Sequence, residues 1–177
     1  GKQVTIDDAI DSKDGGDDEP EDVDDPVGGV FASGIKNLPL MKTTAAGFEG
    51  FLRDQWTTLA ETSDRILATD LTATWNYNSV ADDWCAEREA VRKTLIQTFG
   101  AEYSPSLQAT LYAMGRAVLE ARPLVEEITL TLQNEHRVLL DLSPLELDNP
   151  NVLFQPIEEP FGKIEASLCR TSDAQSD

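Results

Sequence analysis

Two helical patterns follow each other in residues 82–123, which read DDWCAEREAVRKTLIQTFGAEYSPSLQATLYAMGRAVLEARP. The first covers residues 82–99 and repeats apolar side chains at three- to four-residue spacing, with Gly100 expected to end it. The second opens with Ser104 as N-cap and Pro105 at the first helical position, and a proline follows its last turn. The stretch therefore predicts two consecutive helices.

Strand patterns lie on both sides of these helices. The strand-like segments are residues 2–10, 29–44, 65–77, 125–132, 136–142 and 162–170. Pro39 falls inside one of them and predicts an edge strand or a bulge there. Strands outside and helices inside, in the order ββααββ, predict an α+β fold in which an antiparallel sheet carries two helices on one face.

Length and composition favour one domain, residues 1–177, with 40% hydrophobic residues. No run of about eighteen apolar residues and no basic-plus-apolar leader is present, so we expect a soluble, intracellular chain with no membrane span. One histidine and two distant cysteines are too few for a Cys/His metal site, so no metal is expected. A net charge of −19 disfavours a nucleic-acid partner.

The acidic residues are concentrated near the start of the chain, where residues 1–26 hold eleven acids and two lysines. Within that region, residues 12–29 contain only two valines and no aromatic side chain, so we expect a disordered loop insertion. A calcium loop is the alternative, but the ligand alternation and closing glutamate of an EF-hand are missing. We therefore favour solvated surface charge over a calcium site. The excess of acidic over basic residues in the whole chain would also suit a protein that works in high salt.

General sequence motifs identify no chemistry. The chain has no GxGxxG, no GxxxxGK, no GxSxG and no HExxH. Composition and periodicity alone therefore indicate an α+β domain but not what it does.

Four separate segments resemble the urate oxidase family, in the family's own order. They are residues 47–65 (GFEGFLRDQWTTLAETSDR), 103–112 (YSPSLQATLY), 132–136 (LQNEH), and Asp148–Asn149 with 160–164 (PFGKI). The resemblance implies the tunnelling fold, in which ββααββ units associate into a barrel. It also implies a cofactor-free oxidase that converts urate and dioxygen to 5-hydroxyisourate and hydrogen peroxide.

The resemblance also implies which residues bind the substrate. Urate is a planar anion with hydrogen-bonding atoms on its edge, so its site needs an apolar lid, a bidentate cation and an amide. Phe48 would stack on the ring, Arg65 would hold one edge, and Gln108 would complete the clamp. Leu107 would act through its backbone N–H, and Leu59 would supply apolar contact.

Asn134 and His136 are the two residues that the resemblance assigns to catalysis. We expect them on a bend between two strands, with both side chains on the same side. In the family the asparagine lies over the urate plane where dioxygen or water sits, and the histidine belongs to a proton relay. Taken singly, His136 and Arg65 each have a simpler interpretation. A lone histidine at a strand start is usually on the surface, and an arginine at a strand start usually forms a salt bridge.

One departure from the family concerns length. The family's subunit contains two ββααββ units, and the first contributes a lysine and a threonine followed by aspartate, none of which is matched here. The chain therefore resembles the second half, inactive unless an N-terminal half is supplied. The family's site forms between subunits of a homotetramer, so we expect a homo-oligomer. No peroxisomal tripeptide ends the chain, which suggests the cytoplasm of a prokaryote.

Two other functional classes compete with this interpretation. A tunnelling-fold module with metal-dependent chemistry on a purine- or pterin-like ring would need more ligands than His136 alone. An interaction protein recruited through its acidic segment would have no reason to contain Phe48, Arg65 and Gln108 together.

Overall fold

The structure, a computed structural model, describes residues 31–58 and 60–170. Its elements in chain order are β1 (Phe31–Lys42), β2 (Leu67–Tyr77), α1 (Trp84–Ala101), α2 (Leu107–Ala121), β3 (Val125–Leu139), the 3₁₀ helix η1 (Ser143–Leu145) and β4 (Phe154–Cys169). This confirms the ββααββ order. The expected strand at 2–10 and the acidic insertion at 12–29 lie outside the described residues.

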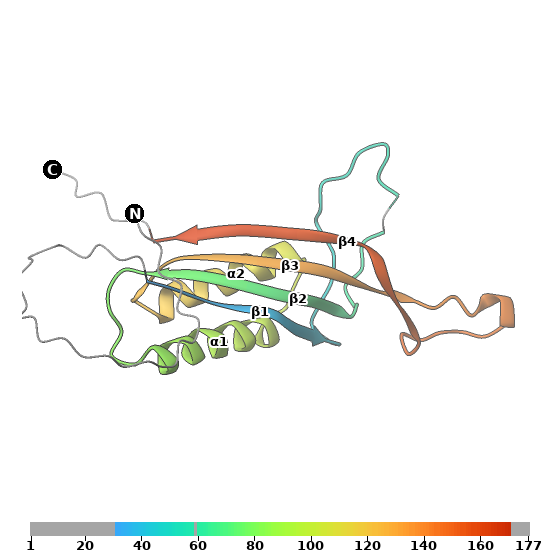
Figure 1. Cartoon of the computed structure of the whole chain (residues 1–177). Coiled ribbons are helices and arrows are strands. Elements are labelled where there is room, and N and C mark those ends of the chain that lie inside the picture. Colours follow the sequence, from blue (N-terminus) through green and yellow to red (C-terminus); the bar gives the residue numbers. More distant parts are fainter. Residues whose placement is uncertain (1–30, 59, 171–177) are drawn as a thin grey trace, which may run out of the picture.

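The four strands form one antiparallel sheet in the order β1-β2-β3-β4, and both helices cover the same face of it (Figure 1). The expectation for Pro39 is confirmed because β1 is an edge strand of this sheet. Its pairing with β2 also shifts register between Ile35 and Leu38, where Asn37 has a φ of 54°. An edge strand with a bulge tolerates proline because no ladder hydrogen bond is required from it. The expected α+β architecture is confirmed.

The hydrophobic core lies between the sheet and the two helices. Its largest fully buried side chains are Leu67, Leu71 and Trp75 of β2, Val91 and Leu95 of α1, Leu107, Met114 and Val118 of α2, and Val125, Ile128, Leu130 and Leu132 of β3. The apolar side of each predicted helix is thus buried. Burial of each large side chain stabilises the fold by about 1.5–3 kcal/mol. Within the described residues, no helix is long and apolar enough to cross a membrane.

The second helix begins later than the sequence predicts. Ser106, not Ser104, is the N-cap, and its side chain accepts a hydrogen bond from the amide of Ala109. Ser104 is buried, and its backbone pairs instead with Ala45 and Gly47 in the segment between β1 and β2. That tertiary pairing holds residue 104 extended, so the helix can start only after Pro105. Similarly, α1 continues through Gly100, which was expected to end it.

The expected bend between two strands at residues 133–136 is wrong, because β3 is continuous from Val125 to Leu139. Its pairing with β2 is regular through this region, with Ala68 opposite Glu135. The irregularity lies in the pairing with β4. Asn134 is opposite Gly162 and His136 is opposite Ile157, so β4 advances by five residues while β3 advances by two. Pairing on both sides therefore keeps a polar segment extended that reads locally as a turn.

A buried ion pair joins the start of α1 to the end of α2. Glu87 is 6% exposed, and Arg122 donates to both of its carboxylate oxygens, from Nε at 2.9 Å and from Nη2. The hydrogen bond to Glu87 raises the pKa of Arg122 above its ordinary value. The pair thus fastens the two helices at one end.

Arg122→Met is expected to lower the free energy of unfolding by about 3 kcal/mol, since it leaves the Glu87 carboxylate buried without its partner. Urea denaturation followed by circular dichroism measures this change. The double variant Glu87→Gln/Arg122→Met removes the stranded charge and should recover part of the loss. If the double variant is no more stable than Arg122→Met, the loss is not due to the buried charge.

Candidate functional site

The connection between β1 and β2, residues 43–66, projects from one end of the sheet as a separate lobe (Figure 1, teal). Its two arms are joined at the base by backbone hydrogen bonds. The amide of Phe48 donates to the carbonyl of Thr62 at 2.6 Å, and the reverse bond measures 3.1 Å. The amide of Arg65 donates to the carbonyl of Ala46 at 3.0 Å. Two residues seventeen positions apart, Phe48 and Arg65, are thereby brought together.

Arg65 is a half-buried cation that lies beside an aromatic ring. Its guanidinium carbon is 5.4 Å from the centroid of the Phe48 ring, and its Nε donates to the carbonyl of Gly47 at 2.8 Å. Burial lowers the pKa of Arg65, and Tyr103 acts in the opposite direction. Among residues 31–58 and 60–170, Arg65 forms no ion pair, and neither of its terminal nitrogens donates a hydrogen bond. The N–H groups on the two terminal nitrogens of this half-buried cation thus have no acceptor among the described residues.

Phe48 has one ring face covered by another aromatic side chain. Phe51 stacks on it with a centroid distance of 4.5 Å and an interplanar angle of 15°. The Arg65 guanidinium also lies over this ring, so a flat ligand that stacks on Phe48 must lie beside Arg65 or displace Phe51.

Gly47 occupies a position without room for a side chain. A Cβ atom there would lie 2.2 Å from the Tyr103 hydroxyl and 2.7 Å from the carbonyl oxygen of Thr62. The Tyr103 hydroxyl donates to Glu49 at 2.7 Å, and this hydrogen bond raises the pKa of Tyr103. Glycine at residue 47 lets the two arms of the lobe and the segment before α2 approach each other closely.

The start of α2 is fastened to the same region. The amide of Gly47 donates to Ser104 at 2.8 Å, and that of Glu49 donates to Pro105 at 3.3 Å. Leu107 is the first residue of the helix and its side chain is buried, while the side chain of Gln108 is exposed. The amides of the first turn have no intrahelical acceptor, and they form the positive end of the helix dipole. An anion held by Arg65 would therefore meet favourable potential here.

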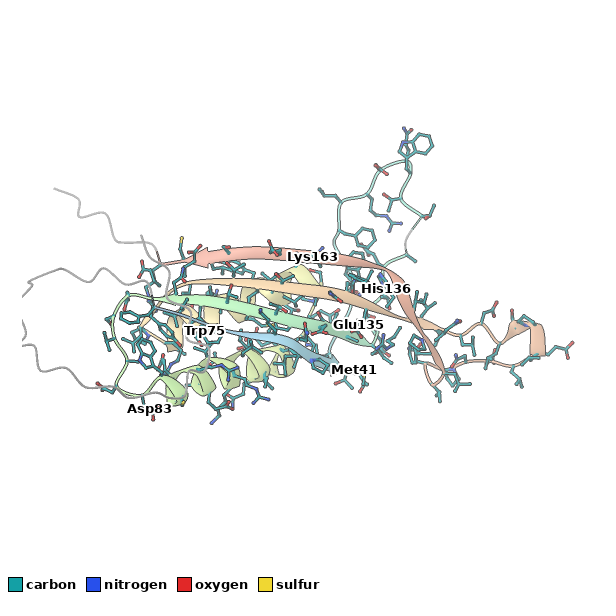
Figure 2. The ribbon with its side chains drawn as sticks, viewed as in Figure 1. Met41, Trp75, Asp83, Glu135, His136 and Lys163 are labelled. Atoms are coloured by element: carbon teal, nitrogen blue, oxygen red, sulfur yellow. The ribbon has the colours of Figure 1, made fainter. Side chains whose placement is uncertain are left out.

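Asn134 and His136 both lie on β3. Figure 2 shows His136 at the end of the sheet from which the lobe projects. Asn134 is opposite Thr69, near the point where β2 continues from Arg65. Both side chains are half-buried. Because β3 is a continuous strand here, alternation along it favours one face for residues two apart, so the prediction that both side chains lie on the same side now rests on a strand and not on a bend.

The structure thus joins the base of the lobe to the start of α2, which hold Phe48, Arg65, Leu107 and Gln108. Asn134 and His136 lie on β3, which pairs with the start of β2 just after Arg65. Leu59 lies outside the described residues. The sequence did not indicate the role of Gly47, although this residue opens the segment 47–65 that carries the resemblance. In the part of the chain that the structure describes, no group of three His, Cys, Asp or Glu side chains could hold a metal ion.

Comparison with known proteins gives a consistent result. The family model for uricase matches residues 31–165. Uricase from Arthrobacter globiformis is 47% identical over 141 residues, which are 80% of this chain and 47% of that protein. Uricase from Dictyostelium discoideum is 42% identical over 142 residues, 80% of this chain and 50% of that protein.

A solved structure agrees with the sequence relatives. The crystal structure of uricase from Arthrobacter globiformis superposes with a TM-score of 0.77 at 45% identity, covering 82% of this chain and 50% of that one. The chain therefore spans about half the length of the curated relatives it matches.

Proposed function

The chain belongs to the uricase family, and on that premise we propose that it carries one half of a urate oxidase site. Together with a complementary half, it would oxidise urate with dioxygen and water to 5-hydroxyisourate and hydrogen peroxide, without a cofactor. In that reaction two electrons pass from the urate ring to dioxygen, which leaves as peroxide, and water supplies the new hydroxyl group. The match covers residues 31–165, which include every site residue named above.

The observation that carries this proposal is the state of Arg65. A half-buried cation normally has a carboxylate partner, because an isolated buried charge is costly. This protein has 33 acidic residues, yet none of the described ones pairs with Arg65. An arginine held by Nε, whose two terminal nitrogens have no acceptor in residues 31–58 and 60–170, suits a planar anion that accepts two parallel hydrogen bonds. Urate is such an anion.

The other residues complete the clamp in this proposal. Phe48 covers a face of the ring, Gln108 binds its edge through the side-chain amide, and the backbone of Leu107 adds a donor at the helix start. Leu59 supplies apolar contact at the wall.

Asn134 and His136 belong to the chemistry. Asn134 would hold dioxygen or water over the ring, and His136 would move a proton, for which a side chain that titrates near neutral pH is suited. Their place on one face of β3, beside the start of β2, supports a shared role.

A second half is needed because the chain spans about half of its relatives. We propose that this half supplies a lysine and a threonine to the proton relay and that the complete protein is a homotetramer. The described sheet supports association, since β1 and β4 are both edge strands. Edge strands present unpaired backbone groups that pairing with another chain would satisfy.

Turnover is expected only when both halves are present. The test mixes or fuses this chain with the N-terminal half of the Arthrobacter globiformis relative and follows both the loss of urate absorbance and the release of peroxide. The chain alone should bind urate under anaerobic conditions but give no peroxide. If the completed protein neither binds nor consumes urate, the proposed function is wrong.

A further inference from the structure

A single asparagine organises the loop that joins β3 to β4. The side-chain nitrogen of Asn149 donates to the carbonyls of Leu140 at 2.9 Å and Leu153 at 2.7 Å. Its side-chain oxygen accepts from the amides of Val152 at 3.0 Å and Leu153 at 3.1 Å. An amide side chain offers two donor hydrogens and two acceptor positions, so all of them are used. This exposed loop therefore has a defined shape at its base.

The next asparagine, Asn151, connects that loop to the lobe. Its backbone lies in the left-handed region, with a φ of 57°, which asparagine tolerates better than most residues. Its amide donates to the carbonyl of Asn149 at 2.9 Å. Its side-chain nitrogen donates to the Asp64 carboxylate at 3.0 Å, across 87 positions of sequence. This conformation aims a donor at the residue that precedes Arg65.

Asp64 is also held by a residue of its own lobe, Thr62. The hydroxyl of Thr62 donates to the carbonyl of Asp64 at 2.9 Å and accepts from the Asp64 amide at 3.4 Å. The amide of Arg65 then donates to Ala46. The backbone that carries Arg65 is consequently fixed on one side by the lobe and on the other by the β3–β4 loop. The Asp64 carboxylate is engaged with Asn151, and no ion pair joins it to Arg65 within the described part of the chain.

We propose that Asn151 and Asp64 are positioning residues, whose hydrogen bond holds Arg65 in place to bind the anionic substrate. The inference rests on the proposed function for the identity of that substrate. Neither side chain needs to touch the ligand. Their effect is to restrict the backbone of residue 65, so that the two free guanidinium nitrogens present one geometry to the ligand.

The test exchanges donor and acceptor. Asn151→Asp places two carboxylates in opposition and should weaken anaerobic urate binding about five- to tenfold. The double variant Asn151→Asp/Asp64→Asn restores the bond with its direction reversed, and binding should return to within about twofold of the original chain. Gln155→Glu, which adds the same charge to an exposed position of β4, is the matched control.

Amide hydrogen exchange gives a readout that does not depend on urate. Exchange in residues 60–67 should accelerate in Asn151→Asp, return in the double variant, and stay unchanged in α1. If exchange in residues 60–67 does not respond to Asn151→Asp, the positioning role is wrong. If it responds as expected but urate binds neither the original chain nor the protein completed with the N-terminal half, the proposed function is wrong and the link between the two segments stands. If exchange responds and binding is unaltered, Arg65 does not depend on the link and the inference is overturned.

Discussion

Arg65→Met is expected to weaken urate binding by about a hundredfold or more, since it removes two charge-assisted hydrogen bonds at a half-buried site. Methionine retains most of the apolar volume, so the contact with Phe48 and the fold should persist. The measurement is an anaerobic titration of the chain with urate, where the absence of dioxygen prevents turnover. The unfolding free energy, measured in parallel, should change little, because among the described residues Arg65 forms only backbone bonds and the ring contact.

Two further arginine variants separate charge from geometry. Arg65→Lys retains the charge but loses the planar fork, so its affinity should fall between those of the original chain and Arg65→Met. Arg116→Met removes an exposed arginine that pairs with Glu120 on α2 and should leave binding unchanged. Affinity for Arg65→Met within twofold of the original chain would show that the anion does not bind here.

Gly47→Ala is expected to lower the free energy of unfolding by about 1–3 kcal/mol, because the added methyl group meets a backbone carbonyl that has little freedom to move. Urate affinity should fall by about tenfold or more, since the carbonyl of Gly47 is the acceptor that orients Arg65. Urea denaturation and the same anaerobic titration measure the two effects.

Controls for this variant come from the same chain. Gly100→Ala lies in α1, where nothing is within 4 Å of the added carbon, and it should preserve binding and stabilise the helix by about 1 kcal/mol. Gly47→Ala/Tyr103→Phe removes the hydroxyl that lies 2.2 Å from the new carbon but leaves the clash with Thr62. Only partial recovery is therefore expected. Complete recovery would mean that Tyr103, and not the approach of the two arms, limits residue 47.

Residues 91, 95 and 99 of α1 and residues 107, 111, 114 and 118 of α2 show why both helices could be predicted. Their spacing repeats within each helix and reports only that one side is buried, which is a local property of the chain. The start of α2 could not be predicted in the same way. Ser104 and Ser106 are equally good N-caps by residue type, and the choice was made by Ala45 and Gly47, which lie about sixty positions away.

The proposed binding residues show the same division between what the sequence predicts and what the tertiary structure decides. Phe48, Arg65, Gln108, Asn134 and His136 were proposed from a resemblance, since residue type alone does not distinguish a ligand-binding arginine from one in a salt bridge. That Arg65 has no carboxylate partner among the described residues is a result of packing. So is the hydrogen bond between Asn151 and Asp64, in which a left-handed asparagine meets a carboxylate from another loop.

From the amino-acid order alone follow the ββααββ succession and the buried side of each helix, because both depend on spacing between near neighbours, and the edge or bulge in β1, because Pro39 has no N–H to donate to a neighbouring strand. Tertiary structure was needed for the continuity of β3, the late start of α2, the glycine contact at residue 47 and the lack of an ion-pair partner for Arg65 among the described residues. Each of these depends on which distant segments come into contact. The net charge of −19 does not reveal a cation that has no acidic partner among the described residues, because net charge is a sum over the chain and a binding site is a local arrangement.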